Sequence, residues 1–177
     1  MDKTISQFIS EKIGMVILEE PTSKEYHNFS LGGIECEVGE FLYGLIRMIR
    51  PNWMLETGTY HGISSSYIGL ALKENGKGKL ETIEFQGSLL DEGKVKWGKL
   101  GIASHIIPYL MRSEEFQPSQ NYDLIFLDSE PPIRFPEMIK FYSYLNEGGY
   151  LIIHDLPRTL CQGNINPSLP DYHSWPY

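Results

Sequence analysis

Short apolar runs alternate along the chain with longer stretches in which apolar residues recur every three or four positions. Runs of the first kind predict buried strands, and stretches of the second kind predict amphipathic helices. Helices are expected at residues 5–13, 37–50, 63–74, 88–100 and 136–146. Strands are expected at residues 53–57, 80–85, 105–110, 122–128 and 150–154. Alternation of strands with helices is typical of an α/β fold built on a mainly parallel sheet.

Turn and breaker residues mark several boundaries of these elements. Pro51 ends the helix before the first strand, and Gly148-Gly149 is expected to stop the helix that begins at Pro136. Pro108 cannot donate a ladder hydrogen bond, so its strand is expected at a sheet edge or a bulge. The run YDLIFLD is the clearest strand and is expected to be central and covered on both faces. These features favour a doubly wound, Rossmann-like sheet with the strand order 3-2-1-4-5.

The length of 177 residues predicts a single domain. We expect this domain to span residues 1–155, with residues 1–36 forming an N-terminal helix and lead-in. Residues 156–177 are rich in proline and show neither helical nor strand periodicity, so an irregular tail is expected. Cys36 and Cys161 lack metal-ligand spacing and are expected to be plain thiols.

Charge and hydropathy narrow the choice of partners. The formal net charge is -8, and no stretch concentrates lysine and arginine, so nucleic acid is not expected as a partner. A small molecule fits better. No apolar run is long enough to span a membrane, and residues 1–10 lack the pattern of a signal peptide. The chain is therefore expected to be cytoplasmic, with no membrane partner.

The loop after the first predicted strand carries the first candidate chemistry, because ligands of doubly wound sheets bind where the strand order reverses. This loop reads Glu56-Thr57-Gly58-Thr59-Tyr60-His61-Gly62. Gly58 permits a tight turn or a close approach of backbone to ligand, and Gly62 permits the next helix to pack closely on the strand. Glu56 suits a ligand with a positively charged amino group. A nicotinamide dinucleotide would favour G-x-G-x-x-G, a pattern whose first glycine is absent here.

An ordinary strand-turn-helix connection is the alternative interpretation, because matches to E-x-G-x-x-x-G arise often by chance. The next predicted strand favours ligand binding. Glu84 ends the run LETIEF about one βα unit downstream, where an acid can bind both hydroxyls of a ribose. Acids at two neighbouring strand ends are harder to attribute to chance.

The order of motifs resembles the class I S-adenosylmethionine-dependent methyltransferases, and more closely their small-molecule O-methyltransferase-like branch. LETGTYHGISS is similar to the glycine-rich first motif, LETIEF to the acidic second-strand motif, YDLIFLDSE to the fourth-strand motif, and LNEGGYLIIHD to the glycine-glycine turn and fifth strand. The resemblance implies S-adenosylmethionine as cofactor. Glu56, Gly58 and Gly62 would face its methionine part, Glu84 its ribose and Phe85 its adenine, with Thr57, Thr59, Tyr60, Ser113 and Asp128 completing the cofactor site. Arg112, before Ser113, departs from the aspartate-containing adenine contact that the family commonly has there.

The same resemblance implies the candidate catalytic residues Asp128, His154 and Asp155. In metal-dependent relatives, aspartates at the positions of Asp128 and Asp155 bind a divalent cation. Leu156 replaces the usual amide or acid, so a third protein ligand is missing unless Glu130 supplies it, and a metal is not expected. Both aspartates could instead cap strand ends. His154 is the alternative general base, and an ordinary histidine at a strand end is its structural alternative.

These motifs predict transfer of a methyl group to a small-molecule acceptor, with oxygen favoured by the family branch. The alternative is a non-catalytic S-adenosylmethionine-binding or assembly protein with the same fold. The C-terminus favours this alternative, because the family's C-terminal hairpin is expected to be absent or atypical. A homo-oligomer could then cover the open sheet edge.

Overall fold

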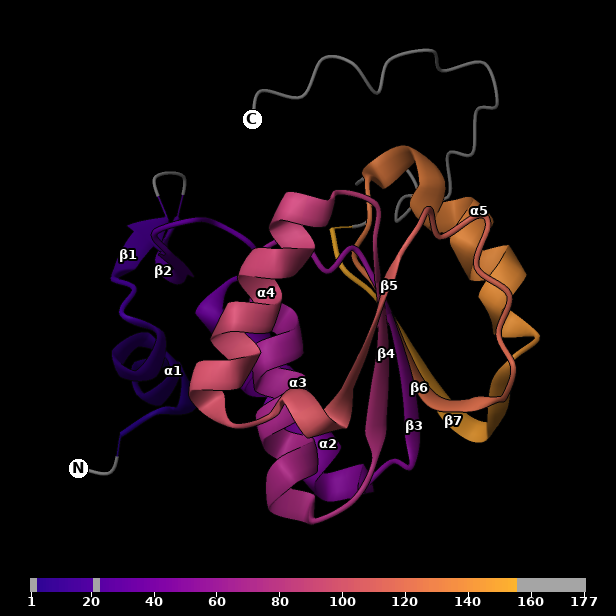
Figure 1. Ribbon diagram of the computed structural model, residues 1–177, viewed down its shortest axis with the longest axis horizontal. Coiled ribbons are helices and arrows are strands. Elements are labelled where there is room, and N and C mark those ends of the chain that lie inside the picture. The colour runs from indigo at the N-terminus through magenta and orange to yellow at the C-terminus, as the bar shows by residue number, and fades with distance from the viewer. Residues whose placement is uncertain (1–2, 21–22, 156–177) are drawn as a thin grey trace.

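The computed structural model describes residues 3–20 and 23–155, which form a sheet with helices on both faces (Figure 1). An N-terminal part precedes the sheet and consists of α1 (Ile5–Ile13), β1 (Ile17–Glu20), β2 (Ser23–Phe29) and α2 (Cys36–Ile49). The sheet and its crossovers follow as β3 (Trp53–Thr57), α3 (Ile63–Asn75), β4 (Lys79–Glu84), α4 (Gly87–Leu100), β5 (Ile106–Leu110), β6 (Tyr122–Leu127), α5 (Pro131–Tyr142) and β7 (Leu145–Ile153). A 3₁₀ turn, Ala103–His105, leads into β5.

The five-stranded sheet has the order β5-β4-β3-β6-β7, and all four pairings are parallel. Counted from β3, this is the predicted order 3-2-1-4-5, which is confirmed. Pro108 lies on β5 at the edge of the sheet, as its missing N–H requires. The strand order reverses between β3 and β6, so their carboxyl ends form the topological switch point where ligands of such sheets bind.

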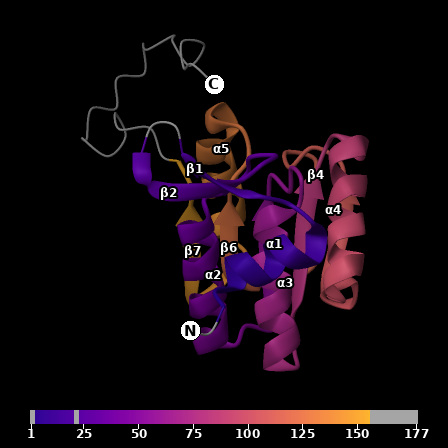
Figure 2. The same ribbon diagram turned by 90° about the vertical axis from the view of Figure 1, so that its left-hand side faces the viewer.

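Helices α2, α3 and α4 cover one face of the sheet, and α5 covers the other (Figure 1). Neighbouring residues of one strand therefore serve different cores, since strand side chains alternate between faces. On β3, the fully buried Met54 joins the core under α2 and α3, while Leu55 joins the core that includes Phe141 of α5. Helix α1 lies across the outer side of α2 and α3 and also contacts α4, and its residues Ile9 and Ile13 bury their side chains there (Figure 2).

Helix α1 has strong end signals of its own. Thr4 and Gln7 form a reciprocal capping box at its start, and Gly14 ends it in the left-handed conformation.

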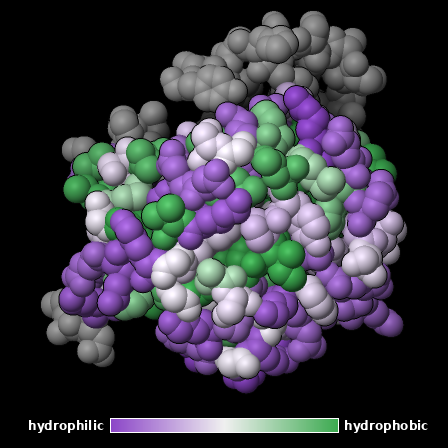
Figure 3. All heavy atoms as spheres, in the orientation of Figure 1, coloured by the Kyte–Doolittle hydropathy of each residue, from purple (hydrophilic) through white to green (hydrophobic). Residues whose placement is uncertain are grey.

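The face shown in Figure 3 mixes hydrophilic and hydrophobic residues, with the hydrophobic ones in small groups. Among the described residues, no helix has both the length and the apolar character to cross a bilayer.

The sequence did not predict the antiparallel hairpin of β1 and β2. Its strands, ILEE and SKEYHNF, lack a clean alternation of apolar and polar residues, and two of their apolar side chains are exposed, Leu18 by 51% and Tyr26 by 44%. Two of its residues anchor it to the main body: Phe29 is buried, and Ile17 packs against the same core. An isolated two-stranded hairpin is marginal in water, so this contact stabilises it.

The prediction for the last helix and strand was wrong in its boundaries. Helix α5 begins at Pro131, five residues before Pro136, which lies inside the helix. The helix ends at Tyr142, and β7 starts before the Gly148-Gly149 pair rather than after it. Gly148 has φ 76° within an irregularity that opposes β6, so it marks a bulge and not a helix stop. The other helices and strands of the predicted set lie within one residue of their expected bounds.

Several predictions fall on residues 156–177, which lie outside the described part of the chain. They include the irregular tail, Cys161 and the absent or atypical hairpin. Cys36, which is described, is buried and is a free thiol.

Candidate functional site

A cavity of about 300 Å³ opens at the carboxyl ends of β3, β4, β5 and β6. Its wall contains six of the predicted cofactor-binding residues: Gly58, Tyr60, Glu84, Phe85, Ser113 and Asp128. The opposite part of its wall comes from the start of α5, including Glu130, Ile133 and Arg134. The cavity therefore lies at the switch point of the sheet and has a size suited to a small ligand.

The glycines of the β3–α3 loop bring three segments into close contact. Gly58 has φ 78°, and a Cβ atom there would lie 2.2 Å from the carbonyl oxygen of Asp128, so only glycine fits. Gly62 has φ 75°, and a Cβ atom there would lie 2.7 Å from the Cα of Gly93 on α4. The close packing at Gly62 is thus against α4 and not, as expected, against the strand. Both glycines let the loop run tightly along the rim of the cavity.

Glu56 does not line the cavity but lies fully buried beneath the loop. The hydroxyl groups of Ser65 and Thr82 donate hydrogen bonds to its Oε2, while its Oε1 has no partner among the described residues. Burial raises the pKa of Glu56 to about 7, and the carboxylate of Asp128 adds to this rise, whereas the surrounding hydroxyls oppose it. The orphaned Oε1 is an acceptor that a positively charged group would satisfy.

The two threonines of the predicted loop also turn away from the cavity wall. Thr57 is buried, and its hydroxyl donates to Oε2 of Glu137 at 2.9 Å. Thr59 is buried as well, and its hydroxyl lies 2.5 Å from that of Thr82, which in turn donates to Glu56. These two side chains support the loop from below.

Glu84 joins the end of β4 to the loop of β3. Its carboxylate accepts hydrogen bonds from the backbone amides of Tyr60 and Gln86, both at 2.8 Å. Each of its oxygens keeps a further lone pair, so the carboxylate can still accept from a ligand. Next to it, the ring of Phe85 is 45% exposed, and the guanidinium of Arg112 lies 4.9 Å from the ring centroid. This cation–π pair explains why an arginine can stand at that place.

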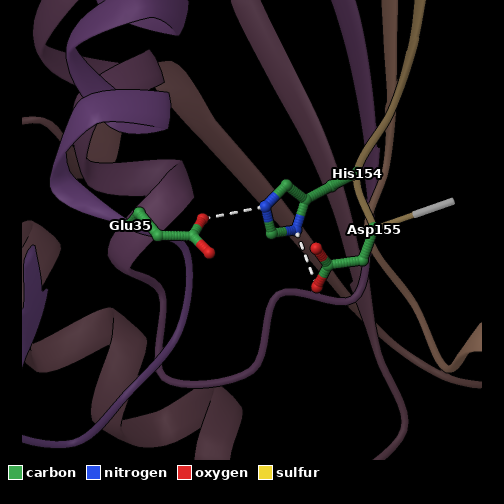
Figure 4. Close-up of side chains that lie close together, drawn as sticks. All are labelled: Glu35, His154 and Asp155. Atoms are coloured by element: carbon green, nitrogen blue, oxygen red, sulfur yellow. Dashed lines mark hydrogen bonds and ion pairs between the residues drawn. The ribbon is translucent and has the colours of Figure 1, made fainter. Parts of the chain in front are cut away.

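Asp128, at the end of β6, is the centre of an ionic network that the sequence did not predict. Its Oδ1 lies 2.9 Å from Nδ1 of His154 and 3.2 Å from the guanidinium of Arg134. The other ring nitrogen of His154, Nε2, lies 2.9 Å from the carboxylate of Glu35 (Figure 4). Glu35 precedes α2 and is 119 residues away from His154 in the sequence. Asp155 approaches Nδ1 less closely, at 3.5 Å.

These contacts govern the charges in the network. Burial works against a charged His154, but the carboxylates of Asp128 and Glu35 outweigh it and raise the histidine's pKa to about 10. Burial also raises the pKa of Asp128, while His154 and Arg134 oppose that rise. The hydrogen bond from His154 is the main cause that lowers the pKa of Glu35. In this arrangement both nitrogens of His154 are engaged, so the ring offers no free lone pair for use as a general base.

Comparison with known proteins identifies the family. Residues 55–156, more than half of the chain, match the family model described as a methyltransferase domain. The chain belongs to this methyltransferase-domain family. No curated protein matches it.

Solved structures of methyltransferases share the fold of this domain. They include the O-methyltransferase TomG from Streptomyces achromogenes, involved in tomaymycin synthesis and in complex with S-adenosylmethionine (23% identity, TM-score 0.66, covering 78% of this chain and 63% of that one). The O-methyltransferase from Bacillus cereus, bound to S-adenosylhomocysteine, has 16% identity and a TM-score of 0.64, covering 78% of this chain and 64% of that one. Podospora anserina methyltransferase PaMTH1, also bound to S-adenosylhomocysteine, has 14% identity and a TM-score of 0.63, covering 87% of this chain and 62% of that one. This methyltransferase-domain chain thus spans less than two thirds of each of these relatives.

The methyltransferase domain has one group of described residues that could hold a metal ion. Glu35, His154 and Asp155 each bring one ligand atom to within 4.8 Å of the others. This group differs from the predicted pair, because Asp128 is not part of it. Glu130 lies at the start of α5 and lines the cavity but does not join the group.

Three functional candidates of this domain were missed in the sequence. The side chain of Glu35 precedes a helix without capping it, and Arg134 lies two residues before the predicted start of the last helix at Pro136. Glu137 is 1% exposed, and its Oε2 accepts from Thr57 and Ser129, while burial raises its pKa. No local pattern marks Glu35, whose partner His154 lies 119 residues away. Arg134 and Glu137 have near partners, Asp128 and Ser129, but they lie on a helix whose start the sequence did not locate correctly.

Proposed function

We propose that this protein transfers a methyl group from S-adenosylmethionine to a small-molecule acceptor, and that the acceptor atom is oxygen. The observation that carries the proposal is the cavity wall, which combines the Glu84 carboxylate, the exposed Phe85 ring and the tight backbone at Gly58. The proposal assigns this activity to one domain over residues 1–155.

The residues present fit the three parts of the cofactor. The carboxylate of Glu84 can accept hydrogen bonds from both hydroxyls of a ribose, and the Phe85 ring offers an apolar face to a purine. Ser113 lines the same end of the cavity. The backbone from Gly58 to Tyr60 would lie along the methionine part.

The buried carboxyl of Glu56 adds negative charge beneath the loop that would hold the methionine part of the cofactor. Its Oε1 has no hydrogen-bond partner among the described residues, and a cationic ligand in the nearby cavity would offset part of the cost of burying this group through space. Asp128 lines the cavity, and its negative charge adds to the rise of the pKa of Glu56 that burial causes. We propose that the cavity wall near Asp128, with Glu56 buried behind the loop, is the end of the cavity that holds the methionine part of the cofactor.

When bound, S-adenosylmethionine would supply an activated methyl group to the acceptor oxygen, with S-adenosylhomocysteine as the leaving group and the hydroxyl proton released to solvent or to a carboxylate. The residues of this chain contribute orientation, because their side chains are fixed by hydrogen bonds before any ligand binds. Asp128 is held by His154 and Arg134, and Glu84 is held by backbone amides. The structural relatives support oxygen as the acceptor atom, since TomG and the Bacillus cereus protein are O-methyltransferases.

A non-catalytic cofactor-binding protein is the second candidate, and the state of His154 favours it. This histidine was expected as an alternative general base, but carboxylates engage both of its ring nitrogens. A proton from an acceptor hydroxyl would then have to pass to solvent or to another carboxylate. Cofactor binding without methyl transfer would be the signature of this candidate.

Methyl transfer can be measured with S-adenosylmethionine labelled in its methyl group and a panel of small phenols, sugars, hydroxy acids and amines. We expect label in at least one hydroxylated acceptor and loss of transfer in Glu84→Gln, while Glu147→Gln, an exposed control, keeps it. Transfer to amines alone would contradict oxygen as the acceptor atom. Cofactor binding without transfer to any member of the panel would favour the second candidate.

A further inference from the structure

We infer that Arg134 and His154 take the place of a divalent metal ion at Asp128, so that this corner of the site works with cations built into the chain. The inference rests on the proposed function, which locates Asp128 beside the transferred methyl group. It departs from the metal-dependent relatives that the sequence resembles, in which aspartates at the positions of Asp128 and Asp155 bind the ion. It is carried by the positions of donors around Asp128.

Arg134 is a fixed cation whose donors are almost fully used. Its guanidinium lies 3.2 Å from Oδ1 of Asp128, and its Nε donates to the carbonyl of Ser129 at 2.6 Å. Its Nη1 donates to the carbonyls of His154 at 2.6 Å and Asp155 at 2.9 Å. The residue is 7% exposed, and a guanidinium does not lose its proton in proteins. These bonds keep a positive charge next to Asp128 and tie the end of β7 to α5.

His154 closes the other side of Asp128 by geometry. Its Nε2 lies 2.9 Å from a carboxylate oxygen of Glu35 (Figure 4), and its Nδ1 lies 2.9 Å from a carboxylate oxygen of Asp128. An ionised carboxylate can only accept hydrogen bonds, so both nitrogens must carry a hydrogen for both bonds to form. A histidine in that state has no lone pair left to bind a metal ion. His154, the histidine of the candidate metal group, is therefore occupied by its hydrogen bonds to Asp128 and Glu35.

The remaining donors do not fit a divalent ion in this arrangement. Oδ1 of Asp128 already faces two positively charged groups, and a metal ion at this oxygen would meet both at close range. Glu35 is held by His154, and the side chain of Asp155 is 66% exposed. Two carboxylates without a neutral histidine make a weak site for Zn²⁺, which is held mainly by nitrogen and sulfur ligands. Three carboxylates facing two built-in cations are close to neutral without any ion.

This arrangement also gives Glu35 a positioning role. Glu35 lies outside residues 55–156, the part that matches the family model, and it reaches the site from the segment before α2. Through His154 it contributes to the placement of Asp128. The N-terminal part of the chain is thereby connected to the cavity by a defined chain of ionic contacts.

The test is a titration of the chelator-treated full chain with MgCl₂, MnCl₂ and ZnCl₂ by calorimetry, in the absence of cofactor. For the wild type we expect no saturable binding below about 1 mM, the weak end of protein sites for hard cations. Arg134→Met removes the guanidinium while keeping an apolar stem, and we expect it to bind Mn²⁺ at least about tenfold more tightly than the wild type. Arg134→Lys retains the charge, and Lys94→Met removes an exposed one, so neither should gain binding.

Saturable binding to the wild-type chain that Asp128→Asn, Glu35→Gln or Asp155→Asn removes would overturn the inference. A folded Arg134→Met variant that binds no more Mn²⁺ than the wild type would also overturn it. If circular dichroism shows that Arg134→Met is unfolded, His154→Asn replaces it, because it removes the second cation and carries the same expectation. Since no cofactor is present, failure of this test is distinct from failure to bind S-adenosylhomocysteine.

Discussion

Replacing Glu56 by glutamine should change how the stability of the protein depends on pH. The side chain is fully buried, and its carboxyl group has a pKa of about 7 because burial disfavours the charged form. Above that pH the folded protein must hold a negative charge that its surroundings only partly stabilise. Glutamine keeps one oxygen for the Ser65 and Thr82 hydroxyls and removes the charge.

The direction in which stability changes with pH follows from which state, folded or unfolded, binds the Glu56 proton more tightly. In the unfolded chain the carboxyl of Glu56 titrates at its ordinary value of 4.5, so the folded state binds the proton more tightly. Its stabilising contribution is complete below pH 4.5 and is lost as the pH rises through about 7. A shift of about 2.5 pKa units corresponds to roughly 3 kcal/mol, most of which is lost between about pH 5 and pH 8.5.

Urea unfolding of the wild type, Glu56→Gln and the exposed control Glu147→Gln at pH values of about 5 and 8.5 measures this effect. Relative to the wild type, Glu56→Gln should gain roughly 2 to 3 kcal/mol in its free energy of unfolding between the two pH values. The cost of burying an amide is the same at both, so it cancels from the comparison. The reasoning is refuted if the difference between Glu56→Gln and the wild type is the same at both pH values.

Three further predictions concern the loop, the strand end and the ionic network. Gly58→Ala should lower the free energy of unfolding by about 3 kcal/mol or more because of the clash with Asp128. Gly14→Ala, with the same φ of 78° and open space around it, should cost only about 1 kcal/mol in the same urea experiment. Glu84→Gln should weaken S-adenosylhomocysteine binding at least about tenfold in calorimetry, because a neutral amide accepts ribose hydroxyls less strongly; unchanged affinity would contradict this. His154 should remain an imidazolium at pH 8 in nitrogen-15 NMR, since its pKa lies near 10. The contribution of its protonation to the free energy of unfolding should be lost only as the pH rises from 6.5 through about 10.

The main sheet could be predicted because its buried strands are continuous apolar runs, as β6 shows. Its order followed from crossover rules and from Pro108, which restricts β5 to an edge. The β1–β2 hairpin was not predicted because the sequences of its two strands show no clean alternation of apolar and polar residues. The start of β7 was misplaced because a glycine pair reads alike in a bulge and in a helix stop.

Part of the candidate site was also visible in the sequence. Gly58 and Glu84 could be located, because strand ends and tight loops leave local signals. Glu35 could not be located, since its partner His154 lies 119 residues away. Arg134 was missed because the predicted helix began at Pro136, whereas α5 begins at Pro131 and carries Arg134 next to Asp128. Prediction also placed Glu56 in the cavity wall, whereas the fold buries it beneath the loop. Long-range contacts of this kind emerge only from the folded chain.

Binding of S-adenosylhomocysteine, measured by isothermal titration calorimetry, tests the proposed cofactor site most directly. We expect one site per chain in the wild type and in Glu147→Gln, and strongly weakened binding in Glu84→Gln. Absence of binding to the folded wild-type chain at high micromolar ligand would contradict the account.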